Sequence, residues 1–402
     1  MMRWPAVSSR QLLRVGEIWG LVLVAVFFAG CFSPAGPKPG RTKLTSRLIE
    51  VPVQVVGHLV VVETNADDDG PWRFLLDTGS SVTLVDPAFA AHHSMPGQTN
   101  GTPEIRVRDA TGALTTLEPT IIPRLEFGEA RFDRVKALIY DCSELSAHLG
   151  RPIHGVIGFP LFRDTILTLD YPGSRLIITP AGQAPLTPGS TINFDTDSPL
   201  PLIPIEVGDR TLLALIDSGN DGPLNLNPAG LNLSFASAPR PGATINALVS
   251  DRIQEVGRLA DPLRIGDYVL PSPVIDLTDD LSSLGGEVLH NFAITFDQAR
   301  GTVTFYRPTT APIETPPRRS AGLSFAKTPA YWRVAGVVPG SPAEAAGVEP
   351  GDLVVRIDGE TVEAWDLGRY RGQVTTASHI AFTFLEGDDE RTVDLPIFDL
   401  VP

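Results

Sequence analysis

Cysteine and positive charge are scarce in this sequence. Two of its 402 residues are cysteine, and 32 Lys and Arg stand against 47 Asp and Glu, which gives a formal net charge of −15. We expect no nucleic-acid partner, because phosphate binding requires a basic surface. The hydrophobic content of 43% is ample for buried cores, and the length suggests two or three domains.

A long hydrophobic run is also missing at the N-terminus. The apolar stretch at residues 18–30 has thirteen residues, which is too short for a comfortable transmembrane helix. It follows Arg3, Arg10 and Arg14, and this arrangement predicts a signal peptide over residues 1–30.

The end of that stretch, Phe28-Ala29-Gly30-Cys31, resembles the lipobox of bacterial lipoproteins. The resemblance implies that Cys31 becomes the lipidated first residue, with residues 31–48 as a flexible tether to the membrane. Ordinary secretion and an uncleaved anchor are the alternatives. In each case we expect an exported protein of the bacterial cell envelope, facing the periplasm or the exterior. Cys142 would then lack a disulfide partner and serve as a small buried hydrophobic residue.

Motifs of several enzyme classes are absent. The sequence has no His-Glu-x-x-His motif and no Cys/His ligand set, so we predict no metal site. It also lacks Gly-x-Ser-x-Gly, Gly-x-Gly-x-x-Gly and P-loop sequences, and we expect no cofactor.

Glycine, proline and short apolar segments, in contrast, are plentiful. Gly and Pro each number 37, and residues 51–64 form a Val-rich segment that alternates or runs apolar. This composition favours many short strands and turns over a helical bundle.

One short pattern occurs twice. An apolar strand runs into Asp, a small hydroxyl residue and Gly at residues 74–79 (FLLDTG) and again at 214–219 (ALIDSG). A second shared pattern follows each copy, ending in Gly158 and in Gly285. Two half-domains of similar layout, each supplying one Asp, are therefore predicted.

Residues 49–307 thereby resemble the pepsin and retropepsin-like aspartic peptidases, which carry Asp-[Thr/Ser]-Gly and a later apolar-apolar-Gly in each lobe. The resemblance implies a mainly β fold of two pseudo-symmetric, barrel-like lobes, at residues 49–185 and 186–307. It also implies that Asp77 and Asp217 form the catalytic pair. A strand-ending turn, in which Asp caps backbone amides, is the alternative for each motif.

The chemistry explains why two Asp residues would share one site. Two carboxylates about 3 Å apart cannot both ionise, so they hold one proton between them. The ionised member takes a proton from a water molecule that attacks the peptide carbonyl, while the protonated member donates to the carbonyl oxygen.

The residues after each Asp would support the pair. Gly79 and Gly219 allow the two turns to approach closely. By resemblance, Thr78 and Ser218 hydrogen-bond across to the opposite turn. Ser80 is expected to donate to Asp77, and Asn220 stands at the matching position, where the family more often has Ser, Thr or Ala.

A lid over the site is expected at residues 104–119, which alternate in polarity around an Asp-Ala-Thr-Gly turn at 109–112. The usual Tyr of the family's flap is absent, and an ordinary surface hairpin is the alternative. Residues 244–259 are a comparable stretch with weaker turn chemistry, and we make no flap prediction there.

The C-terminal part carries a second resemblance. After a Pro-rich linker at residues 308–318, the segment 337–359 (VVPGSPAEAAGVEPGDLVVRIDG) resembles the core of bacterial PDZ domains, which implies a small α+β domain at 319–402. Residues 321–325 resemble the PDZ carboxylate-binding loop, so a peptide would bind beside a strand and the helix near 365–374. A module that packs on the lobes and binds no free peptide is the alternative. The implied peptide-binding residues are Gly322, Leu323, Ser324 and Phe325.

Together these features predict an envelope-located aspartic endopeptidase that recruits protein substrates or partners through its PDZ domain. The main alternative is a catalytically idle, peptide-binding or scaffold lipoprotein. A peptidase that only processes itself is a second alternative.

Overall fold

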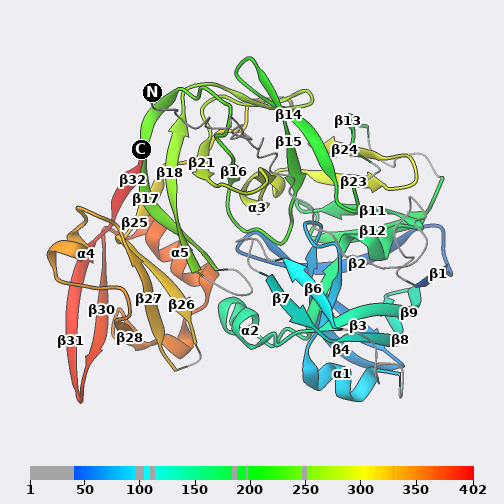
Figure 1. Cartoon of the computed structure of the whole chain (residues 1–402), viewed down its shortest axis with the longest axis horizontal. Helices are drawn as coiled ribbons and strands as arrows, with labels where there is room; N and C mark the ends of the chain where they lie inside the picture. Colours follow the sequence, from blue (N-terminus) through cyan, green and yellow to red (C-terminus); the bar gives the residue numbers. More distant parts are fainter. Residues whose placement is uncertain are drawn as a thin grey trace, which may run out of the picture.

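The computed structural model describes residues 40–95, 104–108, 114–182, 188–195, 198–246, 251–328 and 330–402. The predicted signal peptide, Cys31 and the tip of the predicted lid lie outside these residues. The described chain is mainly β and has three parts: residues 40–180, residues 190–306 and a C-terminal domain from residue 318 (Figure 1). Within those ranges no helix is both long and apolar enough to cross a membrane.

The first part is a β-barrel with two short α-helices. Its elements are β1 (Arg41–Leu44), β2 (Ile49–Val56), β3 (Leu59–Ala66), β4 (Asp69–Asp77), β5 (Thr83–Val85), α1 (Pro87–His93), β6 (Ile105–Arg108), β7 (Leu114–Leu117), β8 (Pro119–Phe127), β9 (Ala130–Ile139), α2 (Ser143–Leu149), β10 (Gly155–Gly158), η1 (Phe159–Phe162), β11 (Thr165–Asp170) and β12 (Arg175–Pro180).

The barrel closes because β8 pairs with both β9 and β3. The remaining neighbours run β3, β4, β10, β5 and β9, with β10 parallel to β4 and antiparallel to β5.

Alternation along β4 gives the strand two different faces. Phe74 and Leu76 enter the barrel core, while Leu75 lies on the outer face, which is also the face of Asp77.

The second part repeats the pairing pattern of the first around its own Asp. The short strand β22 lies between β15 and β16, parallel to β15 and antiparallel to β16, as β10 lies between β4 and β5. The elements are β13 (Ser190–Asn193), β14 (Leu202–Val207), β15 (Arg210–Ile216), β16 (Leu224–Leu226), β17 (Phe235–Asn246), β18 (Asp251–Leu259), β19 (Leu263–Ile265), β20 (Tyr268–Leu270), β21 (Val274–Leu277), β22 (Ser283–Leu284), α3 (Gly286–Leu289), β23 (Ala293–Asp297) and β24 (Thr302–Tyr306).

A shared sheet joins these two parts. Its strand order is β2, β12, β11, β23, β24 and β13, so three strands of the first part continue directly into three strands of the second across one hydrogen-bonded surface. At its centre β11 pairs antiparallel with β23. Thr168 lies opposite Thr295 there, and their hydroxyl oxygens are 2.8 Å apart. The two parts are therefore held by backbone pairing as well as by side-chain packing.

The C-terminal domain has its own core around Trp332, Phe382 and Phe384. Ser341 caps a short helix by accepting a hydrogen bond from the Glu344 N–H, and Gly347 follows that helix with a φ of +73°. The elements are β25 (Arg318–Ser320), β26 (Leu323–Lys327), β27 (Trp332–Val337), α4 (Pro342–Ala345), β28 (Leu353–Ile357), β29 (Glu360–Thr361), η2 (Val362–Ala364), α5 (Leu367–Thr376), β30 (His379–Glu386), β31 (Asp389–Pro396) and β32 (Phe398–Val401).

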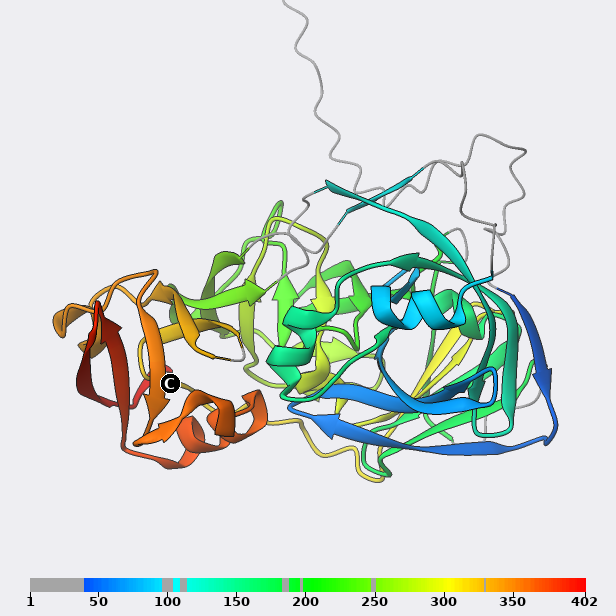
Figure 2. The same cartoon turned by 90° about the horizontal axis from the view of Figure 1, so that it is seen from below.

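Two segments that we expected to be loose connections are in fact packed. Residues 41–44, inside the predicted tether, form β1 and pair with β9. Residues 308–318, the predicted linker, lie against the second part: Ile313 is buried, and the Arg258 guanidinium donates to the carbonyls of Thr315 and Pro316. The C-terminal domain is thus fixed against the second part, at one end of the molecule (Figures 1 and 2).

Candidate active site

Asp77 and Asp217 occupy equivalent places in the two halves. Asp77 is the last residue of β4, opposite Gly158 of β10. Asp217 directly follows β15, and its N–H donates to the Leu284 carbonyl at 3.0 Å. Each carboxyl group accepts a hydrogen bond from the glycine N–H two residues on, at 2.8 Å for Asp77 and 3.0 Å for Asp217.

The two glycines allow the carboxyl groups to meet. A Cβ added to Gly79 would lie 2.4 Å from Asp217 Oδ1, and one added to Gly219 would lie 2.4 Å from Asp77 Cγ. Each turn therefore touches the carboxyl group of the other half. The two carboxyl groups face each other within hydrogen-bonding reach.

Thr78 and Ser218 cross-link the two turns through four hydrogen bonds. The Thr78 hydroxyl donates to the Ile216 carbonyl (2.7 Å) and accepts from the Ser218 N–H (3.0 Å). The Ser218 hydroxyl donates to the Leu76 carbonyl (2.9 Å) and accepts from the Thr78 N–H (3.0 Å). Both side chains are almost fully buried, so these bonds hold the two carboxyl groups in register without competition from water.

The surroundings of the pair favour a shared proton. Burial and the neighbouring Asp217 charge raise the pKa of Asp77 well above its ordinary value. Burial also raises the pKa of Asp217, although hydrogen bonds from Gly219 N–H, Asp77 and Asn220 N–H act in the opposite direction. Protein atoms surround both carboxyl groups, yet each residue retains partial contact with solvent. A substrate water could therefore reach a pair that is largely desolvated.

Replacing Thr78 with Val tests the crossed hydrogen bonds. Valine leaves the Ile216 carbonyl without its donor and the Ser218 N–H without its acceptor. Each buried polar group without a partner lowers the free energy of unfolding by about 1–3 kcal/mol. We expect the free energy of unfolding to fall by roughly 2–6 kcal/mol in urea titrations. Thr304→Val is the control: Thr304 is also a buried threonine, but it lies within β24 and its hydroxyl contacts only the Thr191 hydroxyl in the described chain. Equal losses for both variants would contradict a special role of Thr78.

The sequence-based expectation for Ser80 is wrong in its detail. The Ser80 hydroxyl donates to the Val82 carbonyl at 2.8 Å, and it is the Ser80 N–H that contributes to Asp77. Asn220 acts in the same way, because its side-chain oxygen accepts from the Gly222 N–H at 2.9 Å and its N–H faces Asp217. Both side chains shape their turns, so the Ser-to-Asn difference leaves the two carboxyl groups with similar backbone donors.

Two family models match stretches of this chain. The sequence model of the aspartyl protease family matches residues 61–161, which include Asp77. The chain contains an aspartyl protease domain. The PDZ domain model matches residues 333–372 in the C-terminal domain. A crystal structure of the HtrA3 PDZ domain bound to a phage-derived ligand is 20% identical, over 20% of this chain and 86% of that chain, with a TM-score of 0.18. A comparison with curated proteins found no match.

The predicted lid of the protease domain is a hairpin of β6 and β7, with Ile105 opposite Leu117. Val107 is buried against Leu75 and Leu84, on the face of β4 that carries Asp77. The turn at 109–112 lies outside the described residues. The structure also has a long hairpin of β17 and β18 in the second half, which includes the stretch 244–259 for which we made no flap prediction. Its register shifts lie between Phe235 and Ala243, before that stretch.

Two further residues bear on the site. Tyr171, just after β11, is buried with no hydrogen-bond partner for its hydroxyl in the described chain. Burial raises the pKa of that hydroxyl, and the Asp217 and Asp77 carboxyls add to the rise. No sequence motif marks Tyr171, because it reaches the site only through the shared sheet. Cys142, in contrast, is fully buried, and burial raises the pKa of its thiol to about 12, so it is unreactive as expected.

The PDZ residues predicted to bind peptide lie at the first strand of that domain. Gly322 has a φ of +83° and directly precedes β26, which contains Leu323, Ser324 and Phe325. Phe325 contacts Tyr370 of α5, with ring centroids 5.6 Å apart. The structure therefore places the predicted loop, strand and helix together.

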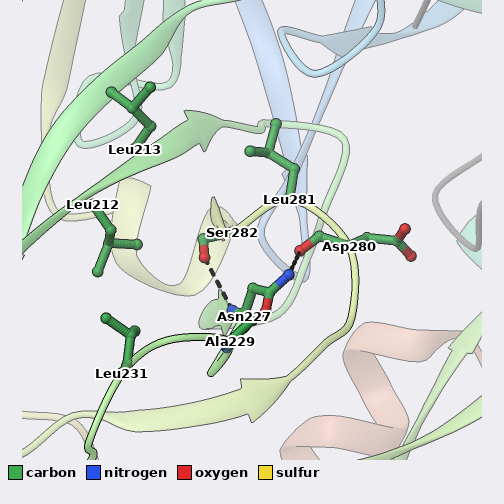
Figure 3. A pocket seen from close by; sticks show the side chains of 8 residues that line it. All are labelled: Leu212, Leu213, Asn227, Ala229, Leu231, Asp280, Leu281 and Ser282. Carbon is green, nitrogen blue, oxygen red and sulfur yellow. Dashed lines mark hydrogen bonds between the residues drawn. The ribbon is translucent and has the colours of Figure 1, made fainter. Parts of the chain in front are cut away.

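Other features of the described chain do not form part of this site. A shallow, mostly apolar pocket lies on the second half and includes neither Asp77 nor Asp217 (Figure 3). Asn227 borders it and donates to the Asp280 carbonyl at 2.9 Å. Within the described residues, no group of three or more His, Cys, Asp or Glu side chains could hold a metal ion.

Proposed function

We propose that this protein is an aspartic endopeptidase with a two-lobed, pepsin-like arrangement, in which a water molecule activated between Asp77 and Asp217 hydrolyses peptide bonds. The observation that carries the proposal is the pair of glycine turns locked by the Thr78 and Ser218 hydrogen bonds, with the carboxyl groups in contact. A simple capping role would not require two such turns to meet.

The steps follow from the properties of the pair. With one proton shared, the ionised carboxyl removes a proton from the water as it attacks the peptide carbonyl carbon, and the protonated carboxyl donates to the carbonyl oxygen. As the C–N bond breaks, a carboxyl group returns a proton to the leaving amine. The hairpin of β6 and β7 would exclude bulk water during these steps.

The proposal also covers location and recognition. The lipobox resemblance supports an enzyme anchored to the bacterial envelope through Cys31. The PDZ domain supports binding of a protein substrate or partner, with a peptide strand added beside β26. The fixed position of this domain against the protease part would hold such a substrate near the catalytic pair.

A pH profile of cleavage tests this function. Activity requires one proton on the pair, so kcat/KM is expected to fall at the acid end, where both carboxyl groups are protonated, and again as pH rises through the raised pKa of Asp77. Between the ordinary Asp pKa and that raised value the folded protein binds more protons than the unfolded chain, so the pair's contribution to stability declines as pH rises.

The measurement is the cleavage of an unfolded protein, followed by mass spectrometry of the products, with and without a statin-type peptide inhibitor. Inhibitor-sensitive cuts at several sites of the added protein support an endopeptidase. A single cut within the enzyme itself would indicate self-processing. A folded protein that cleaves nothing at acid or neutral pH and binds no inhibitor would exclude the enzyme.

A further inference from the structure

Asp221, four residues after Asp217, lies where the two halves and the PDZ domain meet. Its carboxylate is 2.7 Å from a guanidinium nitrogen of Arg371 on α5, and its carbonyl accepts a second guanidinium hydrogen bond at 3.4 Å. His148 at α2 lies 3.7 Å from the same carboxylate, and the His58 ring donates to the Asp221 carbonyl at 3.0 Å. Residues distant in sequence thus converge on one position of the catalytic loop 217–222.

The residues on either side of Asp221 are firmly held and lead directly to the catalytic pair. The Asn220 carbonyl accepts from the Gly286 N–H at 2.6 Å, and the Gly222 carbonyl accepts from the Glu287 N–H at 3.0 Å. The Asn220 N–H in turn supports the carboxylate of Asp217. A shift of Asp221 would therefore alter the hydrogen bonds that set the position and proton affinity of Asp217.

Arg371 is the main charge that compensates Asp221. The Arg371 charge and the hydrogen bond from His148 hold the pKa of Asp221 well below its usual range, despite its burial. Burial lowers the pKa of His58, so that ring is neutral near pH 7 and contributes a hydrogen bond but no charge. Removing Arg371 would leave the Asp221 carboxylate buried without a compensating charge. The resulting loss in free energy of unfolding is larger than the amount that the intact ion pair contributes.

Helix α5 also forms part of the PDZ core and binding face. Tyr370, the residue before Arg371, packs against Phe325 and Trp332 with ring centroids 5.6 and 5.5 Å away. Adjacent positions of one helix therefore contact the PDZ core and the catalytic loop. Arg371 therefore links the position of α5 to Asp221.

We propose that Arg371 is a positioning residue for the proposed peptidase reaction, so that the PDZ domain completes the catalytic loop of the second half. This inference rests on the proposed function. It assigns the PDZ domain a role in the chemical step that is separate from substrate recruitment.

Steady-state cleavage by three variants tests the proposal. Arg371→Ala is expected to lower kcat about tenfold to hundredfold, because small displacements of catalytic groups have effects of that size, while KM changes much less. Arg371→Lys, which keeps the charge but loses the paired donors, is expected to recover part of kcat. Adding Asp221→Asn to Arg371→Ala removes the unpaired carboxylate, so the double variant should be more active than Arg371→Ala alone.

Arg369→Ala is the matched control on the same helix. Arg369 pairs with Glu360 inside the PDZ domain and lies over the Trp365 ring, away from Asp221. Thermal unfolding of each variant shows which ones are folded. If Arg371→Ala does not fold, Arg371→Lys and the double variant are used to test the proposal instead. We expect Arg369→Ala to retain wild-type kcat.

The outcomes separate the two proposals. An active wild type whose kcat is unchanged in Arg371→Ala, or equally reduced in Arg369→Ala, overturns the positioning role alone. A rise in KM without a fall in kcat also overturns it and indicates substrate recruitment. A folded wild type without any cleavage contradicts the proposed function, and the positioning role with it.

Discussion

Asp77→Asn is expected to lower kcat by about 10²- to 10⁴-fold, and Asp217→Asn should do the same, because each carboxyl group is needed as either acid or base. Asparagine keeps the shape and can still accept from the Gly79 N–H, but it can neither remove a proton from water nor share one with Asp217. The measurement is the rate of peptide-bond cleavage by purified variants.

The same substitution is expected to raise the melting temperature at neutral pH. Burial and the neighbouring carboxylate disfavour the ionised form of Asp77 in the folded protein, and neither cost applies to a neutral amide. A gain in stability together with a loss of activity is typical of a strained catalytic group. A merely structural aspartate would show a loss of stability instead.

Asp209→Asn is the control for both effects. The Asp209 side chain is 91% exposed in the turn between β14 and β15, so its replacement should change neither kcat nor melting temperature. If Asp77→Asn cleaves peptide bonds at the wild-type rate, the cleavage does not depend on Asp77 and Asp217.

Gly219→Ala is expected to have the second largest effect. The new Cβ would lie 2.4 Å from Asp77 Cγ and within 2.7 Å of both carboxyl oxygens, which is far inside van der Waals contact. The backbone has little freedom to retreat, because the Ser218 N–H and the Gly219 N–H both donate hydrogen bonds inside the site. The two carboxyl groups must therefore separate, and we expect kcat to fall by about a hundredfold or more.

Gly230→Ala controls for the general cost of adding a methyl group. Gly230 has open space around its Cβ position but a φ of +75°, so alanine should cost about 1 kcal/mol of backbone strain without touching the catalytic pair. This variant should be less stable and fully active. Comparable kcat values for the two variants in chemical-quench assays would contradict the close approach of the two turns.

The sequence predicted the local features of the site well. The Asp-[Thr/Ser]-Gly motifs mark the ends of β4 and β15, because each follows a buried apolar strand and needs a glycine turn. The paired strands at residues 105–108 and 114–117 also formed within the hairpin predicted at 104–119. These features depend on residues that are close together in the chain.

Features that depend on distant residues were harder to predict. The Ser80 hydroxyl donates to the Val82 carbonyl and not to the Asp77 carboxylate. The motif could not predict this, because it does not specify the side-chain torsion angle of Ser80. The linker at 308–318 looked loose because it is rich in Pro and Thr. It is held by Arg258, which lies more than fifty residues away in the sequence.

By itself, the sequence determined that this chain is a mainly β protein with two acidic turns and a C-terminal PDZ domain, since alternation, glycine and capping residues act over a few positions. Only the tertiary structure decided that the turns meet, and that Arg371 reaches Asp221 across 150 positions of the chain. The reason is physical: the β11–β23 pairing and the packing of α5 bring these groups together, and such contacts leave no periodic signal in either segment.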